Sequence, residues 1–346
     1  MTTQGIYIYG IVPNFYSTDM FRSLENTEVY AIPFQNISAL VSNKERVLLD
    51  SLDRESLGYM LVHHQKTIED LMTKGFSMII PMQLGTMVNS KDEVVKILEN
   101  GFDLMIETLK KIEFLTEIDL VVSWADFSGV LKDFSMHPDI IELKEEVMRN
   151  TGSLSKIDQV KMGMLVQQKI DEKNKQIELN ILDSLAAVSL DIKTHEVMND
   201  QMITNSAFLV DRVKKEKFEQ MIEQIDRDYK DLLNFKLVGP LPFYSFYTIE
   251  IKALNPEFVI QAKNELELGE ETTESEIKKA FLGKARLYHP DSNLENGDEV
   301  NFNRINKAYH TLLDYSAAAK QLSKKDFISL SKENVNEHLT LVKIKE

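Results

Sequence analysis

Residues 273–291 read TESEIKKAFLGKARLYHPD, and this stretch fixes the structure expected for the C-terminal part of the chain. Thr273 can cap the start of a helix while Glu276 reaches back to it, which is the arrangement of a capping box. The helix then places its apolar residues on one face, at Ile277, Phe281, Ala285 and Tyr288. Pro290 biases His289 away from helical geometry, so the helix is expected to end there.

The basic residues of this helix lie away from its apolar face. At about 100° per residue, Lys279 and Arg286 fall nearly opposite that face, with Lys278 and Lys284 flanking it. A second helix carries its own apolar face, at Phe302, Ile305, Tyr309 and Leu312. The sequence therefore predicts an antiparallel helical hairpin with His289-Pro290-Asp291 at its tip.

This segment resembles the J domain of DnaJ-type co-chaperones. The resemblance covers roughly fifty residues and rests on three runs, 276–281 (EIKKAF), 285–291 (ARLYHPD) and 302–309 (FNRINKAY). It implies that the basic helix docks on an acidic surface of a DnaK-type chaperone and that the tripeptide triggers ATP hydrolysis there. The chaperone-binding residues so implied are His289, Pro290, Asp291, Lys278, Lys279, Lys284 and Arg286.

Two departures from the J-domain pattern bear on activity. The tyrosine expected in the first helix, before the turn at Leu268-Gly269, is missing, and residues 316–320 replace the usual Gln-Lys-Arg-Ala-Ala-like segment. Docking is therefore expected to be weakened or specialised. A helical hairpin kept only for packing remains the alternative.

A second His-Pro-Asp, at His137-Pro138-Asp139, serves as an internal control. The residues before it form no basic amphipathic helix, and those after it include Glu142, Glu145 and Glu146. Here we expect only that Asp139 begins or caps a helix after Pro138.

The composition is that of an acidic globular chain. With 346 residues, 43% hydrophobic and 27% charged, two or three packed domains are expected. The formal net charge of -15 argues against nucleic acid or an anionic membrane surface as partner. No cysteine is present, which excludes disulfides and thiolate metal sites and suits a reducing compartment such as the cytoplasm. No apolar run approaches the ~18–20 residues of a membrane-spanning helix.

The N-terminal part mixes strands with helices. Strands are predicted at 6–12, 28–32, 37–41, 76–81 and 117–124, and amphipathic helices at 53–74 and 90–109. Ser90 is the expected N-cap of the second helix, which Gly101 weakens. This order predicts an α+β domain of ferredoxin-like character over residues 1–130.

The second half continues the α+β pattern before it turns helical. Residues 131–258 are expected to form a helical segment and a second mixed domain, with strands at 206–213, 235–238 and 243–251 and a helix at 214–233. An apolar seam on the helical segment is expected to pack into a core rather than to form a free coiled coil, at Ile177, Ile181, Leu185, Val188 and Ile192. Residues 259–320 form the all-helical J-like unit. Residues 321–346 are a tail with a strand at 339–344.

The first 250 or so residues resemble the gas vesicle protein F/L accessory proteins. The matching stretches are 7–12 (YIYGIV), 80–86 (IPMQLGT), 205–210 (NSAFLV) and 238–246 (VGPLPFYSF). Departures occur at Leu84, where a phenylalanine is common, and at 241–243, where Trp-Pro-Pro is usual; they bear on detailed contacts. The resemblance implies a minor component or assembly factor of the gas vesicle that binds the small, very hydrophobic shell subunit.

The stretch 239–247 is the candidate surface for that subunit. The Gly-Pro-Leu-Pro turn fixes the backbone, and the aromatic residues after it are expected on both faces of the next strand. Core packing is the default for each aromatic, but a strand near a sheet edge could also accept an extended or helical apolar segment. The candidates are Gly239, Pro240, Pro242, Phe243, Tyr244 and Phe246.

Few residues of the sequence suggest a catalytic or metal site. His63 and His64 point about 100° apart on a helix, so they do not face one metal ion. The sequence has no phosphate-binding loop, dinucleotide fingerprint, nucleophile elbow or H-E-x-x-H. We therefore expect no catalytic residue, metal or cofactor. An unrecognised hydrolase is the third hypothesis, beside the two given next.

The leading hypothesis is a cytoplasmic assembly factor at the gas vesicle. Its two α+β domains bind the shell subunit or other gas vesicle proteins, and its J-like unit recruits a DnaK-type chaperone. The alternative is a shell-associated minor structural component whose J-like unit is inactive.

Overall fold

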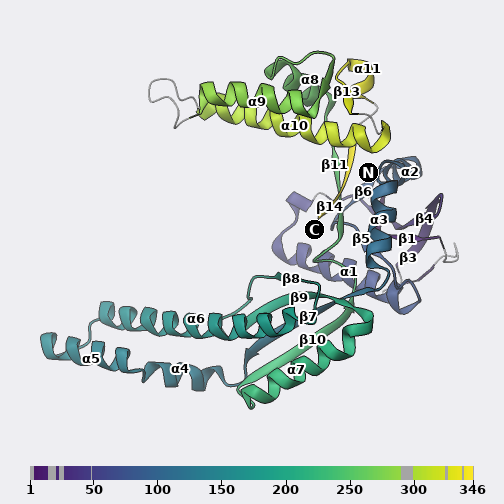
Figure 1. The fold of residues 1–346 in the computed structure, drawn as a ribbon. Coiled ribbons are helices and arrows are strands. Elements are labelled where there is room, and N and C mark those ends of the chain that lie inside the picture. Colours follow the sequence, from purple (N-terminus) through teal and green to yellow (C-terminus); the bar gives the residue numbers. More distant parts are fainter. Residues whose placement is uncertain are drawn as a thin grey trace. The chain divides into compact units, whose positions relative to one another are not determined.

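The computed structural model describes residues 4–14, 21–22, 27–47, 49–289, 299–323, 326–336 and 339–345. It divides the chain into two compact units (Figure 1). The first combines Met1–Lys111 with Tyr247–Glu346, and the second is Ile112–Phe246. The first unit is thus built from both ends of the chain, whereas the sequence predicted consecutive domains with boundaries near 130 and 258.

The main sheet of the first unit centres on β1 (Gln4–Pro13). Its order is β2-β3-β4-β1-β5, all antiparallel, and β6 also pairs with β1. Every residue of β1 after Gln4 is buried, so both faces of this strand are covered. The other strands are β2 (Phe21–Arg22), β3 (Glu28–Phe34), β4 (Ile37–Glu45), β5 (Ile80–Pro81) and β6 (Met87–Val88).

The helices of this part begin at side-chain caps. After the short η1 (Leu49–Ser51), α1 (Arg54–Thr73) starts at Asp53, whose side chain accepts a hydrogen bond from the Ser56 N–H. α2 (Lys91–Asn100) starts at Ser90, as predicted, and α3 (Phe102–Ile112) follows. Gly101 separates α2 from α3, and a Cβ there would lie 2.7 Å from Cγ1 of Val342. The glycine therefore allows the C-terminal strand to approach this helix junction.

The second unit has the order β-α-β-β-α-β. It contains β7 (Leu115–Trp124), α4 (Phe127–Ser135), α5 (Pro138–Thr151), α6 (Lys156–Ala186), β8 (Asp191–Thr194), β9 (Met202–Asp211), η2 (Arg212–Lys214), α7 (Lys215–Tyr229) and β10 (Leu233–Leu241). The antiparallel sheet has the order β10-β7-β9-β8. This is the ferredoxin-like arrangement.

The ferredoxin-like character was therefore assigned to the wrong part of the chain. The strand predicted at 117–124 is β7, and it pairs with β9 and β10 rather than with the N-terminal strands. Its alternating burial shows a sheet with one face covered, but that pattern does not specify which strands are its neighbours.

The core of the second unit lies between this sheet and helices α6 and α7 (Figure 1). Four of the predicted seam residues are buried in it, namely Ile177, Ile181, Leu185 and Val188. The expected core packing of this helix is therefore confirmed. Ile192 lies on β8 instead and packs against the same core.

The C-terminal module of the first unit is mainly helical. Its elements are α8 (Pro256–Glu265), β12 (Glu271–Thr273), α9 (Glu274–Tyr288), α10 (Glu299–Ser323), β13 (Phe327–Ser329) and α11 (Lys332–Val335). One apolar core joins α8, α9 and α10, and it also buries Ile328, Leu330 and Val335. Residues beyond 320 are thus part of the module rather than a separate tail.

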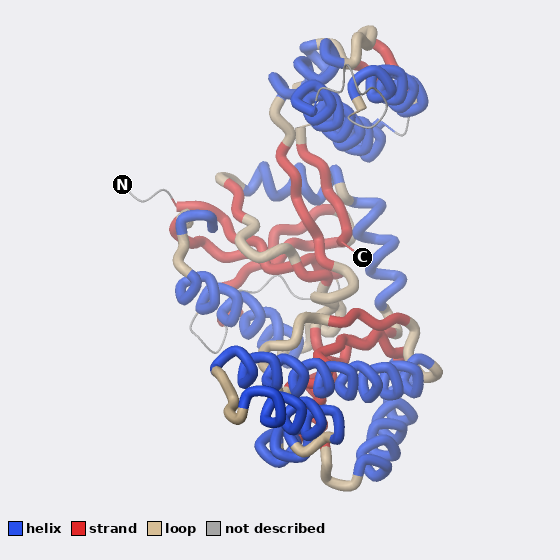
Figure 2. The backbone as a smooth tube through the Cα atoms, turned by 90° about the vertical axis from the view of Figure 1, so that its left-hand side faces the viewer, coloured by secondary structure: helices blue, strands red, loops and turns tan. Residues whose placement is uncertain are grey.

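A two-stranded antiparallel ribbon flanks this module in the sequence. β11 (Thr248–Ala253) leads into the module and β14 (Thr340–Lys345) leaves it, and the two strands pair along their whole length. Figure 2 shows them side by side as the chain enters and leaves the helices. The strand predicted at 339–344 is confirmed. Over the described residues no helix is long and apolar enough to span a membrane.

The contact of β14 with Gly101 can be tested by substitution. Gly→Ala in a helix normally stabilises by about 0.5–1 kcal/mol, whereas overpacking costs about 1–3 kcal/mol. We expect Gly101→Ala to lower the free energy of unfolding by ~1 kcal/mol in urea denaturation. Gly58→Ala is the matched control, because a Cβ at Gly58 in α1 would meet nothing within 4 Å. Equal stabilisation by both variants would contradict the close packing described.

Candidate functional site

The basic helix of the module starts at the predicted capping box. The Thr273 hydroxyl accepts a hydrogen bond from the Glu276 N–H at 3.3 Å, and the Glu276 carboxylate accepts one from the Thr273 N–H at 2.8 Å. The hydrogen bond from the Thr273 N–H lowers the pKa of the Glu276 carboxyl most, and a second one from the Thr273 hydroxyl at 3.1 Å also lowers it. The box fixes where α9 begins and therefore which of its residues face the core.

The apolar face of α9 packs on α10 as the sequence predicted. Ile277 is fully buried, and the Phe281 ring stacks on Tyr309 with centroids 4.2 Å apart. Ile305 and Leu312 of α10 lie in the same core. The predicted helical hairpin is confirmed.

The four predicted docking cations fall into two groups. Lys278, Lys279 and Arg286 are exposed on α9. Lys284 is instead turned toward the C-terminal end of α8, where its ammonium donates to the Glu265 carbonyl at 2.6 Å and to the Glu267 carboxylate at 2.8 Å. This pair lowers the pKa of Glu267. Lys284 therefore fastens α9 within the module, and the exposed basic surface consists of the other three residues.

The histidine of the tripeptide closes α9. The His289 backbone is extended, with φ -61° and ψ 129°, and its N–H donates to the Ala285 carbonyl at 2.9 Å. Its ring meets Phe302 of α10 edge-on, with centroids 5.1 Å apart. The helix thus ends at Tyr288, as predicted, but His289 also bridges the two helices of the hairpin. Pro290 and Asp291 lie outside the described residues.

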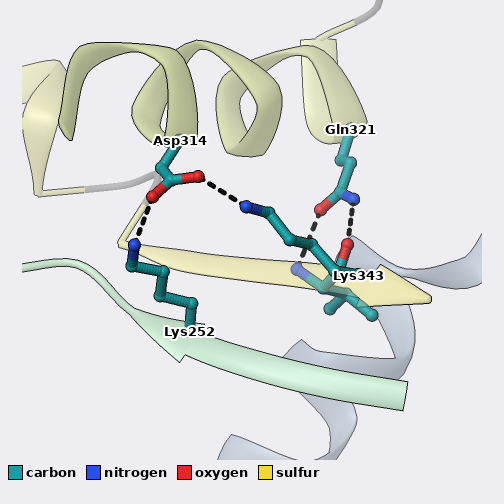
Figure 3. Close-up of polar contacts among 5 residues, drawn as sticks. Lys252, Asp314, Gln321 and Lys343 are labelled. Atoms are coloured by element: carbon teal, nitrogen blue, oxygen red, sulfur yellow. Dashed lines mark hydrogen bonds and ion pairs between the residues drawn. The ribbon is translucent and has the colours of Figure 1, made fainter. Parts of the chain in front are cut away.

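The segment that replaces the usual Gln-Lys-Arg-Ala-Ala-like motif lies on the helix that contacts the ribbon. It lies within α10, and Ser316, Ala318 and Ala319 are buried there. On the same helix the Asp314 carboxylate accepts hydrogen bonds from Lys252 of β11 and from Lys343 of β14 (Figure 3). Burial raises the pKa of Asp314, but its hydrogen bonds to the two lysines outweigh this and lower it. The helix that carries the departure therefore also joins the module to the ribbon.

The control tripeptide has the local role that its flanks indicated. His137 is the N-cap of α5, its ring accepts a hydrogen bond from the Asp139 N–H at 3.4 Å, and Pro138 is the first helical residue. The Asp139 carboxylate pairs with Lys169 at 2.9 Å. The cap is His137 rather than Asp139, and Asp139 ties the helix to α6.

The stretch 239–247 differs from the prediction. β10 runs through Gly239 and Pro240 to Leu241, and residues 243–246 form a turn, with the Phe246 N–H donating to the Phe243 carbonyl at 3.3 Å. The predicted strand at 243–251 is therefore wrong in its first part, because β11 begins only at Thr248.

The turn changes which of the candidate residues are accessible. Phe243 and Phe246 are each 2% exposed, because a turn brings residues three apart to one side instead of alternating them. Pro242 is also buried and Tyr244 is half-buried. Among the shell-binding candidates, only Gly239 and Pro240 are exposed.

A polar cluster around the buried Glu117, which sequence reasoning missed, holds this turn. The Ser245 N–H lies 3.3 and 3.2 Å from the two carboxylate oxygens of Glu117, and its hydroxyl donates to Glu117 at 2.9 Å. Nε2 of His195 lies 3.1 Å from the same hydroxyl. Glu117 and Asp119 share one face of β7, and this pair of carboxylates at alternate positions of an apolar strand is the signal that could have identified them.

Both carboxyl groups are shifted toward the neutral form. Burial raises the pKa of Glu117 to about 8, although the hydrogen bonds from Ser245 oppose it, and burial raises the pKa of Asp119 to about 6. Oδ1 of Asp119 is buried without a partner among the described residues. In a nucleophile–base–carboxylate triad the carboxylate orients the base. Here Glu117 and His195 both contact Ser245, so the cluster is arranged to hold the turn.

The described residues also contain no group of three or more His, Asp or Glu side chains that could hold a metal ion. His64 is buried, and its Nδ1 lies 2.8 Å from the Tyr7 hydroxyl. Burial lowers the pKa of His64 to about 4, which keeps the imidazole neutral in the core.

Comparison with known families accounts for nearly the whole chain. The model of the family "Gas vesicle synthesis protein GvpL/GvpF" matches residues 5–248. The chain belongs to the GvpL/GvpF family. The DnaJ domain matches residues 264–320, which run from the end of α8 through most of α10.

The gas vesicle relatives match about 70% of the chain. Gas vesicle protein F of Nostoc sp. is 22% identical over 71% of the chain and 99% of its own length. Gas vesicle protein F1 of Halobacterium salinarum is 23% identical over 72% of the chain and 96% of its own length. The crystal structure of GvpF from Anabaena sp. has the same fold over 70% of the chain and 97% of its own length, with a TM-score of 0.56 and 23% identity.

The C-terminal part has separate relatives. Chaperone protein DnaJ of Mesoplasma florum is 47% identical over 49 residues, which are 14% of the chain and 13% of that protein. A GvpL/GvpF protein and a J domain are thus joined in one chain.

The cluster around Glu117 predicts a pH dependence of stability. The folded pKa of about 8 lies above the usual glutamate pKa of 4.5, so between these pH values the folded state binds a proton that the unfolded state does not. The stability that Glu117 contributes through this proton is fully present below pH 4.5 and is lost as the pH rises through 8. We expect the second unit to become less stable between pH 5 and pH 9, and Glu117→Gln to flatten this slope in urea titrations. Glu117→Ala should cost ~1–3 kcal/mol at pH 6, because the Ser245 N–H loses its acceptor. An unchanged slope in Glu117→Gln would contradict the assignment.

Proposed function

We propose that this GvpL/GvpF family member is a gas vesicle assembly protein that brings a DnaK-type chaperone to the shell subunit or to other gas vesicle proteins. The observation that carries the proposal is the presence of a GvpL/GvpF part and a J domain in one chain. The proposal places the protein in the cytoplasm, at the gas vesicle. It assigns no catalytic step to this chain.

The exposed charges of α9 support the chaperone part of the proposal. Lys278, Lys279 and Arg286 present positive charge on one helix of a chain whose net charge is -15. An acidic surface on the partner would attract this helix and repel most of the rest of the chain. An acidic partner would therefore dock on α9 in preference to the rest of the chain, as charge-guided docking requires.

Gas vesicle partners are suggested by the family relatives, whose names describe gas vesicle proteins. The candidate surface is narrower than the sequence indicated, because Phe243 and Phe246 are buried. It is centred on the exposed end of β10 at Gly239 and Pro240.

A second candidate function is a structural component whose J domain does not stimulate a chaperone. Two observations favour it: Lys284 is engaged within the module, and His289 packs against Phe302. An ATPase assay separates the two candidates.

We expect His289→Gln to abolish stimulation of the ATPase of a DnaK-type chaperone, because the tripeptide histidine is the implied trigger. His137→Gln is the matched control and should retain full stimulation. Because His289 contacts Phe302, circular dichroism and melting must show that the module stays folded. Stimulation by the His289 variant at the level of the parent chain would exclude the trigger role.

Charge reversal tests the docking helix separately. Lys279→Glu with Arg286→Glu should weaken chaperone binding at least about tenfold at low salt, because like charges then face the acidic partner. Molar salt, with a Debye length of ~3 Å, should weaken binding of the parent chain to the same partner. Binding of the shell subunit should persist in both cases, since apolar association does not weaken with salt.

Co-purification of the chaperone and the shell subunit, with the parent chain and with the charge-reversed variant, measures both interactions. Lys110→Glu with Lys132→Glu, two exposed lysines outside the module, is the matched control. Loss of the shell subunit with retention of the chaperone would contradict the division of roles.

A further inference from the structure

The ribbon of β11 and β14 has two outer edges, and the structure treats them differently. The Leu254 N–H donates to the Leu339 carbonyl at 2.6 Å, in line with the pairing of β11 and β14. In an antiparallel pair, alternate residues direct their N–H and C=O groups to the partner strand and away from it. Ile249, Ile251 and Ala253 of β11 therefore direct theirs outward. On β14 the outward residues are Thr340, Val342 and Ile344.

Side-chain amides cover the outer edge of β14. Gln321 of α10 donates from Nε2 to the Val342 carbonyl at 2.6 Å and accepts from the Val342 N–H at 3.3 Å (Figure 3). Asn100 of α2 donates to the Thr340 carbonyl at 3.1 Å. The Gln321 amide makes the same pair of hydrogen bonds that a neighbouring strand would make. This edge is therefore closed to a further strand.

The outer edge of β11 is open beyond its first residues. The Ile249 carbonyl accepts a hydrogen bond from the Gln83 N–H at 2.8 Å, where Met82 bridges to β11. Past that point, the outward groups of Ile251 and Ala253 have no hydrogen-bond partner among the described residues. Unpaired backbone groups along a strand are a template for another strand.

Ile251 and Ala253 also line a cleft of about 520 Å³, together with Thr340 of β14. Its volume lies within the range of about 300–1,000 Å³ that binding sites occupy. Apolar residues of η1, β6, α2 and the segment between β5 and β6 line it as well, namely Leu49, Met87, Ile97 and Leu84. The cleft thus places apolar contacts beside the two residues whose outward backbone groups are unpaired.

The charge of the cleft indicates what it would bind. Arg46 and Lys96 line it and are exposed, and their charges add to the hydrogen bond from the Asn89 N–H in lowering the pKa of Glu93. Glu93, the only acidic residue of the lining, accepts this hydrogen bond at 2.9 Å and is also hydrogen-bonded to the Asn89 side chain. With two cations and one carboxylate, the lining has one positive charge in excess, which an acidic group of a ligand would complement.

We propose that the outer edge of β11 binds an extended segment of a partner protein as an added strand, with alternating apolar side chains followed by an acidic residue. The N–H and C=O groups of Ile251 and Ala253 hold its backbone. Leu84, Met87 and Ile97 receive its apolar side chains, and Arg46 and Lys96 receive its carboxylate. Main-chain hydrogen bonds supply affinity and the side-chain contacts supply specificity in this mode of recognition. The inference does not depend on chaperone or shell-subunit binding.

The probe is a fluorescent heptapeptide that alternates valine and threonine and ends in aspartate and glutamate, titrated into the full chain by anisotropy. Ala253→Pro removes one outward N–H and leaves the hydrogen bonds to β14 in place, since proline is tolerated at an outward edge position. We expect it to weaken binding about tenfold, as loss of a backbone hydrogen bond and a steric block together would do. Ala253→Val keeps the N–H and should change affinity by less than about threefold.

Two further arms test the backbone and the charge. A peptide N-methylated at alternate residues should bind at least about tenfold more weakly than the parent peptide. Lys96→Glu with Arg46→Glu should weaken binding of the acidic peptide and strengthen that of a peptide ending in two lysines. Lys110→Glu, on α3, should change neither.

No binding of the acidic peptide at millimolar concentration, or equal binding by Ala253→Pro, would overturn the proposal. So would a concentration-dependent dimer of the parent chain that Ala253→Pro abolishes, because the edge then binds a second copy.

Discussion

Pairing of β11 with β14 is the constraint on which the architecture of the first unit depends. Six residue pairs join residues 248–253 to 340–345, so that the end of the chain returns to the point where the module begins. The strand also reaches α2, where Gly101 admits Val342 and Asn100 binds Thr340. Without this pairing the module would be joined to the GvpL/GvpF part by one segment. With it, two antiparallel strands carry the connection.

The consequence for the J domain is a restricted attachment. A flexible linker lets a domain sample a volume that grows with its length. A two-stranded ribbon does not give the domain this freedom. Asp314 adds a contact from α10 to both strands through Lys252 and Lys343. The sequence region that departs most from the usual J-domain pattern, residues 316–320, lies on the same helix and is largely buried. The helix that lacks that pattern therefore also carries the attachment of the module.

The features predicted from sequence are those set by near neighbours. The capping box at Thr273, the helix end before Pro290 and the cap at Ser90 each depend on residues within one helical turn. The partner of β7 could not be predicted in the same way, because β9 and β10 lie far along the chain and alternation does not identify a partner. The turn at 243–246 was missed for a related reason: its geometry is held by Glu117, more than a hundred residues earlier.

The same distinction explains the candidate sites. The basic face of α9 follows from helical periodicity, and three of its four cations are exposed as expected. Lys284 could not be separated from the others, because its acceptors at Glu265 and Glu267 lie at the C-terminal end of another helix, α8. The open edge of β11 was not visible in the sequence at all. It exists because Gln321 and Asn100 close one side of the ribbon, while residues after Gln83 diverge from the other. Whether a strand edge can bind a partner depends on which of its backbone N–H and C=O groups the neighbouring elements leave unpaired. Those elements come from distant parts of the sequence.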